Sequence, residues 1–260
     1  MPFTLAHPAA SVPFVKKGLC LSALIVGSLV PDLSKLISGG PEWNDTHYLP
    51  GLLIFDLPAG LIFLFLFHRV LKEAALCLLP EAHRARLAAL AGEFNFLPLK
   101  RLGWIVGSLL VGILTHALWD YFTHEEGLFV LWTPLLRYPI PVLGHIRLPV
   151  YLLFQQLSTL AGILLLIRWY GQWFRAAAPL ADPPQLFIKP SRRIQAILVM
   201  LALATAGAAF TALISAPSAL NPGDIYETLR SPVIVWLGFF LAEWLLWGLI
   251  VLRFKHNAHA

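Results

Sequence analysis

The sequence predicts an all-α, polytopic helical membrane protein, with about six transmembrane segments and a short re-entrant or half-length helix at its N-terminus. Of its 260 residues, 58% are hydrophobic and only 13% are charged, whereas soluble domains carry roughly 25% charged residues. The mean hydropathy is +0.73. Apolar runs of nearly spanning length recur along the chain, and basic residues gather in alternate connections between them. These observations exclude an ordinary soluble domain.

Six apolar runs approach the roughly 20 residues that a helix needs to cross the hydrocarbon core of a bilayer. They fall at about Leu19–Ile37, Leu49–Val70, Leu102–Phe122, Leu148–Ile167, Ile194–Ile214 and Val233–Leu252. The N-terminal stretch Phe3–Val15 is also apolar, but at about 1.5 Å per residue it is too short to span. We expect this stretch to turn back at Lys16 and Lys17 and to bring His7 toward Asp32.

The lysines and arginines predict the orientation of the chain. Of the 19 basic residues, only Arg137, Arg147 and Arg230 lie in the connections of one side, and Lys35 lies within the first segment. The positive-inside rule therefore places both tails and the Arg-rich loops in the cytoplasm, in a multi-pass protein of the cytoplasmic (inner) membrane. The net charge of +5 is explained by this topology. We expect the lipid bilayer as a partner and no nucleic acid, since no stretch combines aromatic and basic residues.

A proline-rich stretch divides the sequence after the fourth segment. Pro179–Pro190 carries several prolines and no hydrophobic period, which is typical of a linker. We expect a membrane-embedded helical domain over residues 1–178, a cytoplasmic linker over 179–193 and a two-helix membrane hairpin over 194–260. The candidate metal ligands all lie in the first of these parts.

The third segment carries a polar stripe. Within Gly112–His124, the residues Gly112, His116, Asp120 and His124 are successive i, i+4 steps and share one helix face. An ionisable group at membrane depth costs roughly 3 kcal/mol or more unless it is paired, bound to metal or open to water. A divalent metal ion held by imidazole and carboxylate groups would account for the stripe. The alternative is a plain hydrogen bond between His116 and Asp120 inside a helical bundle.

Two further residues reach the same level of the predicted bilayer. Asp32 follows Pro31 near the outer end of the first segment, and His47 lies in the connection before the second. The third segment enters from the cytoplasm, so His116 and Asp120 also lie toward its outer end. Two histidines and two aspartates thus converge on the external half of the membrane, which favours a metal site.

These residues also carry a resemblance. The motifs MPFTLAHPAA, SALIVGSLVPD, Thr46-His47 and G-x-x-x-H-x-x-x-D at Gly112–Asp120 resemble an uncharacterised bacterial membrane family, domain of unknown function 4184, over Met1 to about Tyr170. That family is similar to the membrane-bound metal-dependent hydrolases, and their pattern resembles the zinc-dependent phospholipase C and fungal zinc nuclease group. The resemblance implies a zinc centre. Its implied ligands are His7, Asp32, His47, His116, Asp120 and His124.

The chain departs from the soluble zinc enzymes in its fourth segment. Those enzymes add a later H-x-x-x-E motif, and the resemblance implies a histidine near Gln156 in the membrane family. The corresponding stretch FQQLSTLAG offers only Gln155, Gln156 and Ser158. We therefore expect one or two zinc ions and not three.

If the site is catalytic, the expected reaction is metal-assisted hydrolysis of a lipid or a lipid-linked phosphoester. Asp120 would serve as a ligand, and Asp32 would serve as a ligand and a general base. Arg137 and Arg147 would hold a substrate phosphate, or they simply anchor the external loop at the membrane interface. The external loop Glu125–Arg147 is then expected to lie on the headgroup layer as a lid.

Two classes of function remain open at this point. The first is a membrane-embedded metal-dependent hydrolase that faces the outside. The second is a non-catalytic membrane protein, with either a structural metal site or a role as a small transporter. An enzyme needs an open coordination position, whereas a structural zinc site has a closed shell of four ligands.

Asp56, within the second segment, is interpreted as a hydrogen-bond partner of a metal-bound histidine or of a neighbouring helix.

Overall fold

The computed structural model describes residues 4–33, 46–90, 92–143, 146–181, 190–214 and 225–258. Nearly all of these residues are helical, and a single two-stranded hairpin is the only sheet within these ranges. Five helices are long and apolar enough to cross a membrane. The chain is therefore an all-α polytopic membrane protein, as its composition predicts.

The five candidate spans confirm the second to the sixth predicted segments. They are Leu49–Leu78, Leu99–Trp132, Val150–Ala176, Arg192–Leu213 and Ile234–Phe254. The first predicted segment, Leu19–Ile37, appears as helix α2 (Leu21–Leu33), which has 13 residues. At about 1.5 Å per residue this helix is shorter than the hydrocarbon core of roughly 30 Å. The end of the predicted segment lies outside the described residues, so its crossing of the membrane stays a prediction.

The chain forms two compact units. Unit 1 contains Met1–Ser34, Pro41–Leu64 and Asn95–Ala176, and unit 2 contains Lys35–Gly40, Phe65–Phe94 and Ala177–Ala260. The predicted linker over residues 179–193 lies largely outside the described residues. The division into three domains at that linker stays a prediction. Every candidate metal ligand lies in unit 1.

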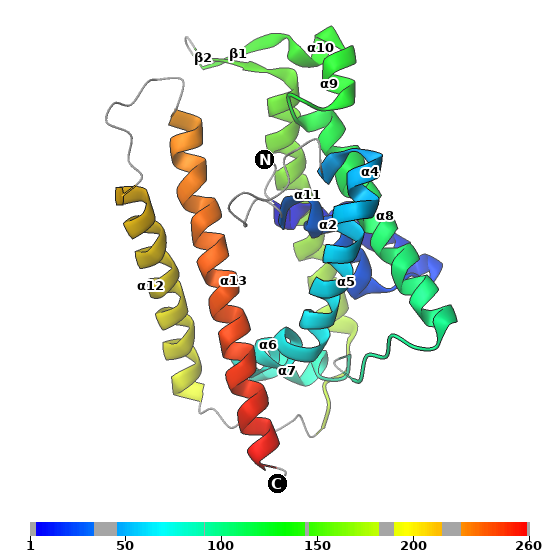
Figure 1. Cartoon of the computed structure of the whole chain (residues 1–260), viewed down its shortest axis with the longest axis vertical. Coiled ribbons are helices and arrows are strands. Elements are labelled where there is room, and N and C mark those ends of the chain that lie inside the picture. Colours follow the sequence, from blue (N-terminus) through cyan, green and yellow to red (C-terminus); the bar gives the residue numbers. More distant parts are fainter. Residues whose placement is uncertain are drawn as a thin grey trace. The chain divides into compact units, whose positions relative to one another are not determined.

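Unit 1 is built on the packing of α2 against α8 (Leu99–Thr123), which is the most extensive contact between its described elements (Figure 1). Two glycines let the helices approach closely. A Cβ atom at Gly27 would overlap the carbonyl oxygen of Leu109, and a Cβ atom at Gly112 would overlap that of Leu24. Small residues are the usual device for close contact between membrane helices, because no hydrophobic effect draws them together in lipid. This contact brings the end of α2 beside His116.

The N-terminal segment folds back onto these helices. It consists of η1 (Thr4–Ala6), α1 (Pro8–Ser11) and η2 (Val12–Lys17). Gly18 then reverses the chain with φ +84°, a conformation that glycine adopts without steric penalty. The Thr4 hydroxyl donates a hydrogen bond of 2.7 Å to Asp32 Oδ2. The predicted return of this segment toward Asp32 is thereby confirmed.

The second span begins at Leu49, two residues after His47. Its first part is α4 (Leu49–Gly51), followed by the π-helical stretch η4 (Leu52–Asp56) and by α5 (Leu57–Leu66). Leu52 packs on Ile113 and Ala117 of α8. His47 is thus held close to the polar stripe of α8.

The connection between α8 and α11 is compact. It contains α9 (Leu128–Trp132), α10 (Pro134–Arg137) and the strands β1 (Pro139–Leu143) and β2 (Ile146–Pro149), and α11 covers Val150–Ala176. Pro139 pairs with Pro149, and Ile140 pairs with Leu148, in an antiparallel hairpin. This hairpin departs from the all-helical expectation, because closely spaced prolines cannot continue a helix.

Unit 2 combines η5 (Phe67–Leu71), α6 (Lys72–Leu78) and α7 (Glu81–Leu87) with two long helices, α12 (Pro190–Ile214) and α13 (Ile225–Ala258). Helices α12 and α13 lie side by side and antiparallel (Figure 1). A Cβ atom at Gly207 would meet the Phe239 ring at 2.8 Å, so the two helices also approach at a glycine. Val251 of α13 packs on Ala74 and Cys77 of α6.

Candidate metal centre

Four predicted ligands from three separate parts of unit 1 meet at one point. Asp32 comes from the end of α2, His47 precedes α4, and His116 and Asp120 lie one turn apart on α8. One ligand atom from each residue lies within 4.8 Å of the other three. All four side chains are buried, with relative exposures of 4% for Asp32 and 0% for the other three. The convergence predicted from the sequence is thus found in the structure.

The spacing of the ligand atoms suits a shared ion. His116 Nε2 lies 3.3 Å from Asp120 Oδ2 and 3.9 Å from Asp32 Oδ2, and His47 Nε2 lies 3.4 Å from Asp120 Oδ2. Zinc bonds to nitrogen and oxygen are about 2.0–2.2 Å long, so tetrahedral ligand atoms lie about 3.3–3.6 Å apart. A direct charge-assisted hydrogen bond would be shorter, at about 2.7–2.9 Å. The two distances to Asp120 therefore fit ligands of one ion better than direct hydrogen bonds, whereas the 3.9 Å distance to Asp32 is longer than this range.

The polar atoms at the centre support the same interpretation. His116 Nε2 and both carboxylate oxygens of Asp120 are buried and have no hydrogen-bond partner among the described residues. Buried polar atoms are almost always hydrogen-bonded or bound to an ion, because leaving them bare costs several kcal/mol. A divalent cation would satisfy these three atoms together. The chemistry of the four residues thus fits a divalent metal.

Contacts around the centre orient its ligands. His116 Nδ1 donates a hydrogen bond of 2.8 Å to the main-chain carbonyl of Ser28, which leaves Nε2 as the nitrogen with a lone pair. His47 Nδ1 lies 2.8 Å from the Thr46 hydroxyl, and Tyr121 donates its hydroxyl proton to the His47 carbonyl. Both histidines thus present Nε2 to the carboxylates. Such supporting contacts fix the tautomer and ring orientation of metal-binding histidines.

His7 and His124 also reach Asp120. The His7 ring stacks on the His116 ring with centroids 3.9 Å apart, and His7 Nε2 lies 3.5 Å from Asp120 Oδ1. His124 Nδ1 lies 3.4 Å from Asp120 Oδ2. The two oxygens of Asp120 thus face different histidines, since Oδ2 also faces His47 and His116. Asp120 is thus contacted by imidazoles on both of its oxygens.

Burial sets the protonation of the two histidines that lie outside the spanning helices. Loss of hydration lowers the pKa of His7 to about 3, and it also lowers the pKa of His47. Both imidazoles are therefore neutral near pH 7. A neutral imidazole is the form that binds a metal ion.

Three other predicted residues lie apart from this cluster of ligands. Arg137 at the end of α10 and Arg147 on β2 are both exposed, and within the described residues neither forms an ion pair with the cluster. Asp56 on η4 is buried, with an exposure of 2%, and lies within electrostatic range of His116 and Asp32. Its Oδ2 atom has no hydrogen-bond partner in the described part of the chain. Roles for these three residues stay predictions.

Several supporting residues were not predicted from the sequence. They are Thr4, Ser28, Trp119, Tyr121 and Gln155. Gln155, with an exposure of 3%, donates a hydrogen bond to the Thr123 carbonyl at 3.2 Å. It adjoins Gln156, near which the family resemblance implies a histidine. An amide side chain within an apolar helix is the pattern that could have identified Gln155 from the sequence. Ser28 acts through its main-chain carbonyl, which no residue pattern reveals.

The fold and the cluster define a class: a polytopic helical membrane protein with a buried His/Asp group that could bind a metal ion. Residues 1–254 match the family described as Domain of unknown function (DUF4184), and the chain belongs to this family. The match extends beyond Tyr170, where the sequence resemblance ended, and includes α12 and most of α13. No curated protein and no solved structure matches the chain. The similarity to metal-dependent hydrolases stays a prediction.

Proposed function

We propose that this protein is a membrane-embedded, metal-dependent hydrolase of a lipid or a lipid-linked phosphoester, acting in the outer half of the inner membrane. The observation that carries the proposal is the buried group of Asp32, His47, His116 and Asp120, whose ligand atoms lie within 4.8 Å of one another. Its mixture of imidazole nitrogen and carboxylate oxygen is one that zinc accepts. Zinc, as one or two ions, is the proposed cofactor.

The number of donors favours a catalytic centre over a structural one. A structural zinc site is closed by four ligands. Here His7 and His124 add two imidazoles within 3.5 Å of Asp120, so the donors exceed one closed shell. Such an excess suits a pair of ions that share Asp120, as in two-metal phosphoesterases. An ion held by these residues would supply an acidified water and polarisation of the phosphoryl oxygen of the substrate.

The residues of the chain itself have distinct proposed roles. Asp120 binds metal and balances its charge. Asp32, whose Oδ2 accepts a hydrogen bond from Thr4, binds metal and accepts a proton as a general base. Arg137 and Arg147 are the proposed phosphate-binding residues, and their exposure leaves both guanidinium groups accessible. Their loop, together with the exposed Trp132 (73%), is proposed to lie on the headgroup layer.

The first experiment measures metal content. Wild-type protein is purified in detergent without chelators, and its zinc, manganese and iron are counted by plasma mass spectrometry. We expect near-stoichiometric zinc in the wild type and its loss in Asp120→Asn and in His116→Gln. Matched controls are Glu243→Gln and His68→Gln, which change a carboxylate and an imidazole in unit 2. These variants should keep their zinc.

Turnover is then measured on the same preparations. Metal-loaded wild type should hydrolyse at least one member of a panel of phospholipids and lipid-linked phosphates, and the Asp120→Asn variant should not. Metal bound without turnover of any panel member would favour the structural metal site. Absence of metal from wild-type and variant proteins alike would refute the hydrolase.

A further inference from the structure

A groove lies directly beside the metal centre in unit 1. Its volume is about 740 Å³, and it is formed by α8, α11 and one residue of α1, Ala10. This volume lies within the roughly 300–1,000 Å³ that is usual for ligand pockets. Both long helices belong to candidate membrane spans, Leu99–Trp132 and Val150–Ala176. The groove therefore opens toward lipid if these helices cross the bilayer as we expect.

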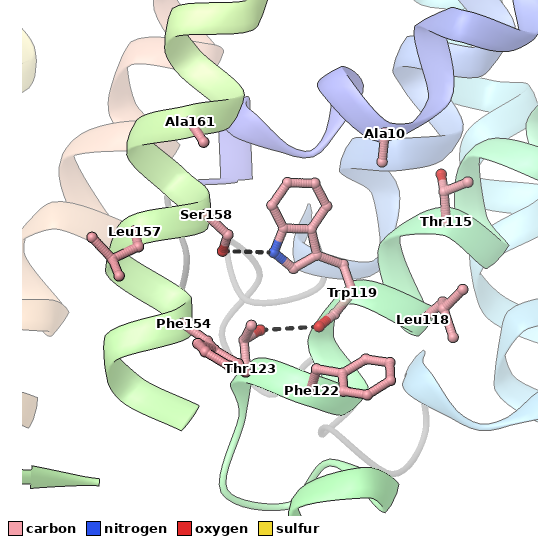
Figure 2. A pocket seen from close by; sticks show the side chains of 10 residues that line it. All are labelled: Ala10, Thr115, Leu118, Trp119, Phe122, Thr123, Phe154, Leu157, Ser158 and Ala161. Atoms are coloured by element: carbon pink, nitrogen blue, oxygen red, sulfur yellow. Dashed lines mark hydrogen bonds between the residues drawn. The ribbon is translucent and has the colours of Figure 1, made fainter. Parts of the chain in front are cut away.

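The lining of the groove is apolar. Its walls carry Leu118, Phe122, Phe154 and Leu157, which are 54%, 40%, 48% and 64% exposed. Figure 2 shows Phe154, Leu157 and the small Ala161 on α11 and Leu118 and Phe122 on α8, with Trp119 between the two helices. Among the residues that the structure describes, none that lines the groove is charged. A charged ligand would lose its hydration here without gaining a charged partner, so the lining favours a hydrocarbon chain.

One side chain separates the groove from the metal centre. The Trp119 indole donates a hydrogen bond of 3.0 Å to the Ser158 hydroxyl across the groove (Figure 2). The same ring meets the His7 imidazole edge-on, with centroids 5.5 Å apart. His7 Nε2 in turn lies 3.5 Å from Asp120 Oδ1. Two side chains, Trp119 and His7, therefore lie between a ligand in the groove and the Asp120 carboxylate.

Thr123 marks the polar end of the groove. It lines the groove with its side chain, while its carbonyl accepts the Gln155 amide at 3.2 Å. The next residue, His124, contacts Asp120 at 3.4 Å. Behind Thr123, outside the lining of the groove, the Gln155 amide and the His124 imidazole follow on the side toward Asp120. A phospholipid shows the same order from acyl chain to ester.

We propose that the groove binds one acyl chain of a glycerophospholipid, with the headgroup ester directed at the metal centre. The choice of a phospholipid as substrate rests on the proposed function. Binding of the acyl chain is independent of it, because none of the candidate metal ligands lines the groove. Both walls of the groove belong to candidate membrane spans and its lining is mainly apolar, so the occupant is a lipid chain rather than a helix of a second copy of this chain.

The test counts tightly held lipid. Protein from nanodiscs of phosphatidylethanolamine and phosphatidylglycerol is washed in detergent and analysed by native mass spectrometry. We expect the wild type to retain one phospholipid after loosely bound lipid is stripped. Ala161→Phe fills the groove and should lose it. Leu160→Phe is the matched control, since Leu160 is an exposed neighbour on α11 (56%) that does not line the groove.

A second measurement locates the chain. A phospholipid with a diazirine in the middle of one acyl chain is photolysed in the same nanodiscs, and labelled peptides are identified. We expect labels on Phe122 and Leu157 that vanish in Ala161→Phe and persist in Leu160→Phe. Leu118→Trp narrows the groove from α8 and should act like Ala161→Phe, so the test holds even if one variant folds poorly.

Two results would overturn the proposal. The first is equal lipid retention and equal labelling in wild type, Ala161→Phe and Leu118→Trp. The second is a stable dimer whose crosslinks join Leu157 of two copies. The failure of this inference is distinct from failure of the hydrolase: lipid retention is also measured after zinc removal, and turnover is also measured on a short-chain phosphoester that does not fill the groove.

Discussion

His7 and Asp120 face each other although 113 positions separate them along the chain: His7 Nε2 lies 3.5 Å from Asp120 Oδ1. The other oxygen of Asp120 faces His47, His116 and His124 at 3.3–3.4 Å. The N-terminal segment thus places a candidate ligand against one oxygen of Asp120. The other oxygen faces His47 and the histidines of the polar stripe of α8.

This relationship predicts a selective effect of His7→Gln. The variant should lower the zinc affinity on the Oδ1 side of Asp120 by about tenfold or more, which is ~1.4 kcal/mol. The ion held by Asp32, His47 and His116 should remain. Competition with a chromogenic chelator would measure both steps. Zinc affinity and stoichiometry identical to the wild type would show that His7 binds no metal.

Thr4→Val tests the support of Asp32. The variant removes the 2.7 Å hydrogen bond to Asp32 Oδ2 while keeping the shape of the side chain. Loss of such an orienting contact typically lowers metal affinity about 10–100-fold, and we expect that range here. Thr115→Val is the control, because the Thr115 hydroxyl bonds the Gly112 carbonyl of its own helix and no other group among the described residues. Equal affinities of the two variants would contradict the prediction.

Gly112→Ala tests the close contact of α2 and α8. The new Cβ atom would lie 2.8 Å from the Ser28 main-chain nitrogen and would overlap the Leu24 carbonyl. Backbone atoms cannot rotate away, so we expect a lower midpoint of thermal unfolding and a loss of zinc as Asp32 moves from His116. The destabilisation should reach about 1–3 kcal/mol or more.

Gly107→Ala on the same helix provides the matched control. A Cβ atom at Gly107 meets nothing within 4 Å, and alanine favours a helix over glycine by roughly 0.5–1 kcal/mol. This variant should therefore keep its zinc and unfold at the same or a higher temperature. A fall in the unfolding midpoint as large as that of Gly112→Ala would refute the role assigned to close packing.

The burial of His7 predicts a pH dependence of the metal-free protein. Its pKa is about 3 when folded and about 6.5 when unfolded, so below pH 6.5 the unfolded chain binds the extra proton. The contribution of His7 to stability is therefore fully present above pH 6.5 and is lost as the pH falls toward 3. The unfolding midpoint, measured from pH 8 to pH 4 without zinc, should fall less steeply in His7→Gln. Parallel curves would contradict the assignment.

Zinc removal should destabilise the wild type selectively. A ligand that binds only the folded state at 1,000 times its Kd adds about 4 kcal/mol to stability. Addition of a chelator should therefore lower the unfolding midpoint of the wild type and leave that of Asp120→Asn unchanged. Scanning fluorimetry in detergent measures this shift. An equal shift in both proteins would mean that the stabilising ion is bound elsewhere.

Local sequence determined much of the fold. Five of the six predicted segments are found as long apolar helices, because hydropathy over about 20 residues is a property of each segment alone. The same reasoning identified the cluster ligands His116 and Asp120, since ionisable groups within apolar helices require a shared explanation. The hairpin of β1 and β2 was missed, because its strands are short and interrupted by prolines.

The sequence by itself thus determined a helical membrane protein and named Asp120 and the five candidate donors that gather around it. Only the tertiary structure decided that His7 and Asp120 Oδ1 meet, that the Ser28 carbonyl orients His116, and that Trp119 stands between a groove and the centre. These relationships depend on how closely α2, α8 and α11 pack and on main-chain atoms at their contacts. Residue type and spacing encode the helices, whereas the contacts between them arise from packing over the whole unit.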